Sequence, residues 1–239
     1  MSRKRSNCRD VRVVCSGAFR AAYQVLVVQF EEATGRRVVT AWGSSAAGAA
    51  TSIPARLAAG EPLDLVIMAR EGLDGLIGQG LVVAAGCADL ARCGIGVAVR
   101  AGAPRPDLSS PDTLVAALKQ ADAIAYSSSA SGIYLEGLFQ RLGLTEALGS
   151  RMKQIAGEPV GAVVARGEAE IGFQQVSELL AVPGVDFVGP LPAEIQHTTV
   201  FAAGIPAAAA EEGTARTLIA HLTAPSAAAI IRGSGMEPA

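Results

Sequence analysis

The stretch Gly172-Phe173-Gln174-Gln175-Val176-Ser177-Glu178 has the pattern of a buried strand that ends where a helix begins. Two amide side chains, Gln174 and Gln175, stand at this junction. Three similar junctions are rich in serine and glycine: Ser16-Gly17-Ala18-Phe19, Gly43-Ser44-Ser45 and Ser127-Ser128-Ser129-Ala130-Ser131-Gly132. Hydroxyls and the N–H groups of helix N-termini stabilise negative charge without a buried counter-cation, so these corners predict a site for a small anion.

Strand-like and helix-like segments alternate around these corners. Val11–Cys15 is a short apolar run that ends in Ser-Gly, and the next segment repeats apolar residues at helical spacing up to Gly35, a typical helix stop. Leu63–Met68 is almost continuously apolar, as in a parallel sheet that is covered on both faces. A second strand–helix series opens with a strand at Ile95–Val99 and runs to Leu180. This alternation predicts an α/β fold with doubly wound sheets.

Length and composition narrow the possible functions. The 239 residues suit two lobes of about 100 residues each. The formal net charge is −2 and no basic stripe is present, so nucleic acid is not an expected partner. Aromatic residues make up only 4% of the chain, which also disfavours base stacking. No uncharged apolar run approaches the ~18 residues of a membrane span, so membrane insertion is not expected.

The N-terminal segment Met1–Asp10 begins like the basic region of a signal peptide. It then enters the first strand, Val11–Cys15, with no separate apolar region and no cleavage site. The sequence as written therefore predicts a cytoplasmic protein, or a periplasmic one if an upstream signal has been removed.

Cysteine and histidine give no sign of a metal site. Cys8, Cys15, Cys87 and Cys93 are separated by 7, 72 and 6 residues, which matches neither a CxxC pair nor a zinc knuckle. The chain has only two histidines, so a three-histidine zinc site is excluded. We expect buried or incidental thiols, no metal and no cofactor.

The order of the corner motifs resembles a known family. The Ser16 and Gly43 corners, the run from Leu57 to Ile67, Ser131-Gly132-Ile133-Tyr134 and Arg166–Gly172 together resemble the molybdate-binding type of periplasmic solute-binding protein. This resemblance covers about Val11 to Gly235 and implies a type 2 periplasmic-binding-protein fold, a two-lobe Venus flytrap. Lobe I would comprise residues 1–92 and 200–239, and lobe II residues 93–199.

The resemblance also implies a ligand site in the interlobe cleft, made of neutral donors. Carried over to this sequence, the candidate ligand-binding residues are Ser16, Gly17, Ser44, Ser45, Ser129, Ser131, Gln174 and Gln175. Gln175 stands where the molybdate binders have a tyrosine, which favours a different ligand. If the strand continues through the two glutamines, alternation places them on opposite faces.

A second similarity is closer. Ser16–Phe19 with Tyr23, Thr40–Gly43, Ile53–Leu57, Tyr126–Gly132 and Ile171–Leu180 resemble the aconitate isomerase branch of the same fold. This implies a cofactor-free isomerase that interconverts cis- and trans-aconitate. The alternative is a solute-binding protein for molybdate or a similar oxyanion, which would serve an ABC permease. A ligand-sensing or scaffold domain of the same fold is a third hypothesis.

The catalytic residue is left unassigned, because no histidine or carboxylate lies inside the polar corners. Three other residues have two interpretations each. Asp64 has a structural capping role or takes part in catalysis, and capping is the favoured interpretation. Arg92 binds a substrate carboxylate or forms a surface ion pair. The chain is expected to cross between the lobes near Ala91–Ile95 and again near Gln196–Val200. His197 lies at the second crossing and is favoured as a satisfied or exposed histidine.

Overall fold

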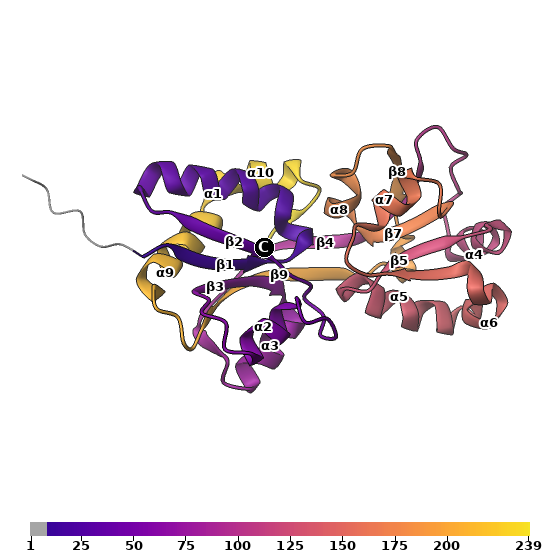
Figure 1. Ribbon diagram of the computed structural model, residues 1–239. Coiled ribbons are helices and arrows are strands. Elements are labelled where there is room, and N and C mark those ends of the chain that lie inside the picture. Colours follow the sequence, from indigo (N-terminus) through magenta and orange to yellow (C-terminus); the bar gives the residue numbers. More distant parts are fainter. Residues whose placement is uncertain (1–8) are drawn as a thin grey trace, which may run out of the picture. The chain divides into compact units, whose positions relative to one another are not determined.

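The computed structural model describes residues 9–239, so Cys8 and the basic segment before Arg9 lie outside the described residues (Figure 1). The chain divides into two compact units. Unit 1 comprises the chain up to Ala91, Val200–Gly233 and Pro238–Ala239. Unit 2 comprises Arg92–Thr199 and Ser234–Glu237. Strands and helices alternate in both, which confirms the predicted α/β class.

Unit 1 is a sheet with helices on both faces. Strand β1 is parallel to β2 on one side and to β3 on the other, and β9 is antiparallel to β3. Figure 1 shows α1 and α10 on one face of this sheet and α2 and α3 on the other. The elements are β1 (Val11–Cys15), η1 (Gly17–Phe19), α1 (Arg20–Thr34), β2 (Val38–Trp42), α2 (Ile53–Ala58), β3 (Leu65–Ala69), α3 (Arg70–Gly78), α9 (Glu212–Leu222), η4 (Pro225–Ala227) and α10 (Ala228–Gly233).

Helix α1 forms where the apolar periodicity predicts it. Tyr23, Leu26 and Phe30 are buried on one face of the helix. Gly35 ends the helix with φ 66°, a left-handed conformation that glycine adopts without steric cost. The other face of the sheet packs on a separate core that includes Val14, Ile53 and Met68. All five residues of β3 are buried, as its near-continuous apolar sequence predicts.

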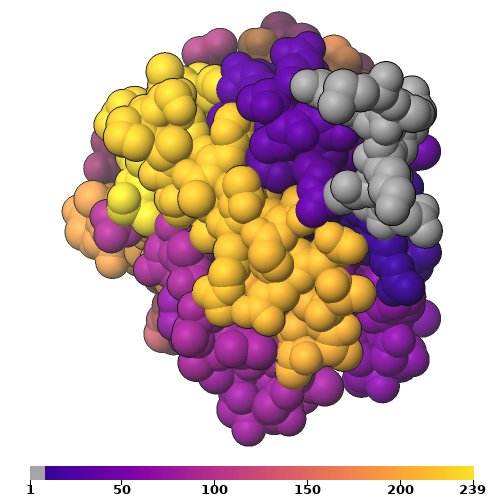
Figure 2. Space-filling view, turned by 90° about the vertical axis from the view of Figure 1, so that its left-hand side faces the viewer, coloured from indigo at the N-terminus to yellow at the C-terminus, as the bar shows by residue number. Residues whose placement is uncertain are grey.

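The C-terminal segment completes unit 1. Helices α9 and α10 both contact α1. In Figure 2 this segment, in orange and yellow, lies directly against the indigo residues from the beginning of the chain. The two ends of the sequence therefore build one core.

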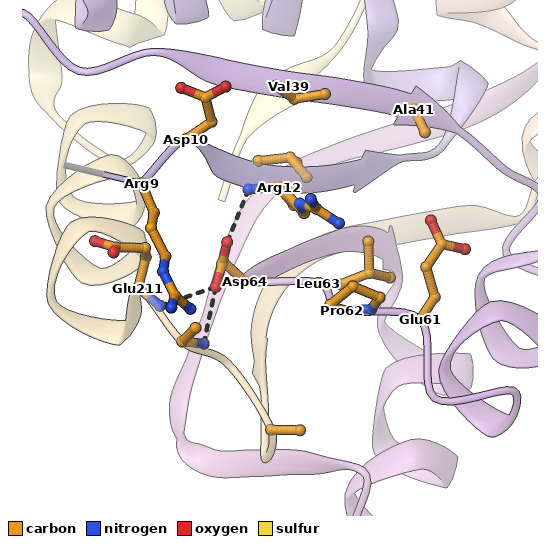
Figure 3. A pocket seen from close by; sticks show the side chains of 13 residues that line it. Arg9, Asp10, Arg12, Val39, Ala41, Glu61, Pro62, Leu63, Asp64 and Glu211 are labelled. Atoms are coloured by element: carbon orange, nitrogen blue, oxygen red, sulfur yellow. Dashed lines mark hydrogen bonds between the residues drawn. The ribbon is translucent and has the colours of Figure 1, made fainter. Parts of the chain in front are cut away.

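A buried carboxylate fastens this C-terminal segment to the sheet (Figure 3). Asp64, which is only 4% exposed, accepts a hydrogen bond from Arg12 N of β1 through Oδ2 (2.8 Å). Its Oδ1 accepts from the backbone N–H groups of Ala210 and Glu211 (2.9 Å each), just before α9. Backbone N–H groups near the start of a helix stabilise a carboxylate. The capping interpretation of Asp64 is therefore confirmed.

Asp64→Asn should destabilise the fold by roughly 1–3 kcal/mol. An amide keeps the shape of the carboxylate but turns an NH2 group towards at least one backbone donor, which leaves that donor unpaired. Urea unfolding measures the loss. Asp122→Asn, at an exposed aspartate of unit 2, is the matched control and should unfold like the parent protein. Equal midpoints for the two variants would contradict the role of Asp64.

Unit 2 has its own α/β arrangement. Strand β5 is parallel to β6 and to β7, and β4 is antiparallel to β7 and to β8. Its core includes Ile124, Leu138, Phe139 and Phe173. The elements are α4 (Pro111–Gln120), β5 (Ile124–Ser127), α5 (Ala130–Arg141), α6 (Leu144–Leu148), η2 (Gly149–Arg151), β6 (Met152–Ile155), α7 (Val160–Ala165), β7 (Ile171–Gln175), α8 (Val176–Leu180), β8 (Val185–Pro190) and η3 (Ala193–Ile195).

Two long strands have residues in both units: β4 (Val82–Arg100) and β9 (Thr198–Pro206). The sequence predicts a sheet in each lobe, but the strands form one hydrogen-bonded order, β2-β1-β3-β9-β4-β7-β5-β6. Because β4 and β9 have residues in both units and are hydrogen-bonded to each other, they join the strands of the two units into one order. The short strand β10 (Glu237–Pro238) also pairs with β4. Within residues 9–239, no helix has the length and apolar character needed to cross a bilayer.

Candidate anion-binding site

In unit 1 the first two polar corners lie side by side. Parallel pairing places Cys15, the last residue of β1, opposite Trp42 of β2 and Ile67 of β3. Ser16 N then donates to Ile67 O (2.8 Å), and Gly43 N donates to Cys15 O (3.1 Å). The Ser16-Gly17 and Gly43-Ser44-Ser45 corners therefore share the carboxyl-end edge of the sheet.

The serines of this edge keep donor capacity. Ser16 is 6% exposed and its side chain makes no capping hydrogen bond. Ser44 Oγ accepts from Ala46 N (3.1 Å), and Ser45 Oγ accepts from Ala69 N at the end of β3 (3.0 Å). In both bonds the hydroxyl oxygen is the acceptor, so the O–H group is left to donate to a ligand. We call this edge the unit 1 polar edge.

Unit 2 has an equivalent edge. Because β5 is parallel to β6 and β7, the carboxyl ends of these three strands lie together. The serine-rich corner follows β5, α7 begins after β6, and Gln174 and Gln175 end β7. Ser128 N donates to Ile155 O (2.9 Å), which joins the first two of these strand ends. We call this the unit 2 polar edge.

One hydroxyl on the unit 2 polar edge stands out. Ser131, in the first turn of α5, is fully buried, and its Oγ has no hydrogen-bond partner among the described residues. A buried polar atom without a partner costs free energy, so such atoms are rare in folded proteins. The neighbouring hydroxyls of Ser127 and Ser129 are instead paired with each other (2.7 Å). A Cβ at Gly132 would overlap Ser127 O, so the tight turn requires glycine there.

The two glutamines are buried and serve different elements, as alternation along a strand requires. Gln174 Oε1 accepts from Val160 N at the start of α7 (2.9 Å). The amide of Gln175 is assigned the orientation in which both its atoms are hydrogen-bonded. In it, Nε2 donates to the carbonyls of Cys93 and Gly94 (3.1 Å each), and Oε1 accepts from Thr199 Oγ1 (2.9 Å). Gln175 therefore ties β4 to β9 within unit 2, and its role in ligand binding stays a prediction.

Gln175→Ala should lower stability by roughly 1–3 kcal/mol, because it leaves two strand carbonyls and a threonine hydroxyl without this partner. Urea unfolding of the variant measures the effect. Gln24→Ala removes an exposed amide from α1 and should leave stability almost unchanged. A Gln175→Ala protein that unfolds at the parent midpoint would show that the amide is dispensable for joining the two strands.

The remaining sequence candidates lie elsewhere. The ring of His197 stacks on Tyr134 (4.6 Å between centroids, 16° between planes). Arg92 is exposed. Burial raises the pKa of the Cys15 and Cys93 thiols, so neither is activated as a nucleophile. Among residues 9–239, no group of three histidine, cysteine or acidic side chains is placed to hold a metal ion.

A hollow of about 580 Å³ opens at the other edge of unit 1, at the amino ends of the strands (Figure 3). Its lining carries both signs of charge, from Arg9, Arg12, Glu61 and Glu211. Asp64 also lines it, but its carboxylate is engaged by three backbone donors. The hollow therefore lacks the neutral donors that distinguish the polar edges.

The structure adds one residue to the unit 1 polar edge that sequence reasoning missed. The guanidinium carbon of Arg20 lies 4.1 Å from the ring centroid of Trp42. Arg20 follows the Ser16 corner and Trp42 precedes the Gly43 corner, but no spacing rule connects residues 22 positions apart. Only the parallel pairing of β1 with β2 brings them together.

Comparison with known proteins identifies the family to which this chain belongs. The family model of bacterial extracellular solute-binding proteins matches residues 11–237. The chain belongs to this family. It is also 40% identical over 227 residues to an aconitate isomerase from a Pseudomonas species, a match that covers 95% of this chain and 87% of that protein. Both similarities that the sequence analysis reported are thereby confirmed.

Solved structures of other proteins have a similar fold. The periplasmic molybdate-binding protein of Azotobacter vinelandii matches with a TM-score of 0.76 and 25% identity, covering 95% of this chain and 98% of that one. The sulfate-binding protein SubI of Mycobacterium tuberculosis matches with a TM-score of 0.73 and 17% identity, covering 96% and 86%. The periplasmic-binding-protein fold predicted from the sequence is confirmed.

Proposed function

We propose that this solute-binding family member is a cofactor-free isomerase that interconverts cis- and trans-aconitate. The 40% identity to an aconitate isomerase, over nearly the whole chain, supports the reaction. The unpartnered, fully buried hydroxyl of Ser131 supports an anionic ligand, because a bound oxyanion would supply the missing acceptor. The proposed ligand contacts are those expected from the sequence: Ser16, Gly17, Ser44, Ser45, Ser129 and Ser131, with Gln174 and Gln175.

The polar edges suit the charge changes of this reaction. Removal of a proton from the methylene carbon next to a carboxylate leaves an electron pair that spreads onto that carboxylate. The double bond then shifts when a proton is added two carbons away, so no atom or electron is gained or lost. Helix N-termini and serine hydroxyls are preorganised donors for the extra negative charge. The three serine corners contain no histidine or carboxylate, so we assign them to binding and charge stabilisation.

The alternative function is binding of molybdate or a similar oxyanion for an ABC permease, in a periplasmic protein. The family and the matched molybdate- and sulfate-binding structures favour this alternative. The neutral character of the serine corners is compatible with it, because these donors suit any small anion.

Purified protein should convert trans-aconitate to cis-aconitate. Proton NMR spectra of the reaction mixture measure the appearance of cis-aconitate. A thermal-shift series with molybdate, tungstate, sulfate and tricarboxylates runs in parallel, because a ligand that binds only the folded state raises the melting temperature. A stabilised protein with molybdate and no aconitate turnover would replace the isomerase by the transport function.

Ser131→Ala should separate binding from stability. The variant removes a buried hydroxyl that has no partner among residues 9–239, so unfolding stability should stay equal or rise. Anion affinity should fall by roughly 1–3 kcal/mol, the range for a lost hydrogen bond to a charged group. Isothermal titration and urea unfolding measure the two effects.

Ser52→Ala is the matched control. Ser52 is equally buried, but its Oγ accepts from Ala55 N as the N-cap of α2. Its removal should cost about 1 kcal/mol of stability and leave anion affinity unchanged. If Ser131→Ala behaves like Ser52→Ala, the Ser131 hydroxyl has no ligand role.

A further inference from the structure

The unit 1 polar edge carries one cation beside its neutral donors. Arg20 is the first residue of α1 and directly follows the Gly17–Phe19 turn. Burial raises the pKa of the Cys15 thiol, and the positive charge of Arg20 offsets a smaller part of this rise. The charge therefore reaches the end of β1, next to Ser16. Its stacking partner Trp42 immediately precedes Gly43.

A chain of contacts holds the guanidinium in place. Trp42 is half-buried at the end of β2, and the guanidinium carbon lies over its ring, 4.1 Å from the ring centroid. The Trp42 ring packs edge-on against Tyr23 of α1 (6.0 Å, 88°). Tyr23 Oη is in turn hydrogen-bonded to Thr40 Oγ1 of β2 (2.9 Å). A guanidinium fixed on an aromatic face loses little further freedom when it binds a carboxylate.

Arg20 has no acidic partner within the described part of the chain. Other arginines do form ion pairs there, among them Arg36, Arg37, Arg56, Arg70, Arg105, Arg166 and Arg216. The side chain of Arg20 is exposed. A planar guanidinium presents paired N–H donors that match the two oxygens of a carboxylate. This arginine is therefore oriented by its contact with Trp42, while no acidic residue between positions 9 and 239 uses its hydrogen-bonding edge.

We propose that Arg20, positioned by Trp42, binds a second carboxylate of a polycarboxylate ligand whose first anionic group is held by the neighbouring serine corners. The proposal rests on the proposed anion-binding function and specifies its substrate class. A compact tetrahedral oxyanion needs only the neutral donors. A di- or tricarboxylate carries further charge that a cation at this edge recognises, so Arg20 is the residue that selects polycarboxylates.

The test uses Arg20→Gln and Arg20→Lys in the full-length protein, with Arg37→Gln as matched control. Arg37 is an exposed arginine of the same unit, but it precedes β2 and so lies at the other edge of the sheet. The probes are tricarballylate, a saturated tricarboxylate that cannot isomerise, crotonate, which has one carboxylate, and molybdate. Isothermal titration gives each affinity, and trans-aconitate turnover is measured separately.

Arg20→Gln should weaken tricarballylate binding roughly tenfold to hundredfold, the loss expected for a hydrogen bond to a charged group. Any affinity for crotonate or molybdate should change by less than about twofold. Arg20→Lys keeps the charge but not the paired donors, so its affinity for tricarballylate should fall between those of the parent and Arg20→Gln. Arg37→Gln should bind all three probes like the parent protein.

Failure of this proposal can be told apart from failure of the isomerase. If the parent protein binds tricarballylate and Arg20→Gln binds it equally well, the role of Arg20 is wrong whatever the turnover. A protein that does not isomerise aconitate, but whose tricarballylate affinity depends on Arg20, would overturn the reaction and keep the specificity residue. An equal loss for all three probes in Arg20→Gln would show a general effect on the edge and would also overturn selective recognition.

Discussion

Parallel hydrogen bonding within each unit is the constraint on which both polar edges depend. It brings the carboxyl ends of β1, β2 and β3 to one edge of unit 1, and those of β5, β6 and β7 to one edge of unit 2. Loops that are far apart in sequence then become neighbours without any direct attraction between them. This register places the serine corners together at each edge. It also positions the adjacent residues Gln174 and Gln175, and the Arg20–Trp42 contact. In open α/β sheets, the carboxyl ends of strands are where ligands generally bind.

The sequence predicted the elements that have a strong local signal. Helix α1, its glycine stop and the buried strand β3 were recognised because apolar periodicity and glycine act over a few residues. Strands β6 and β8 and helix α6 were not predicted, since their short sequences have no clear period. Strand β4 was expected only at Ile95–Val99, because its first half, from Val82, contains small, charged and exposed residues. The pairing of that half in the sheet is a tertiary effect that no local pattern encodes.

Candidate site residues were likewise predictable from the sequence only where a local pattern marks them. The serine corners could be found from sequence because glycine and serine after an apolar strand mark a turn into a helix. The hydrogen bonds of Gln175 could not be found from the sequence, because its partners Cys93, Gly94 and Thr199 lie in other strands. Asp64 was correctly interpreted as a cap, although its partners Ala210 and Glu211 lie 146 and 147 residues away. The Arg20–Trp42 stack depends on register alone.

The division of the chain has a consequence for the order of folding during synthesis. Apart from Ser234–Glu237, unit 2 is one continuous segment, Arg92–Thr199, whereas unit 1 needs residues from both ends of the sequence. When a ribosome has made the first 200 residues, β1, β2 and β3 have neither the full length of β9 nor α9 to pack against. The carboxylate of Asp64 also lacks two of its hydrogen-bond donors until Ala210 and Glu211 have been synthesised. Because distant contacts form late, we expect the middle of the chain to fold before its beginning. Until the last residues emerge, the apolar first strands are a surface for a chaperone to shield.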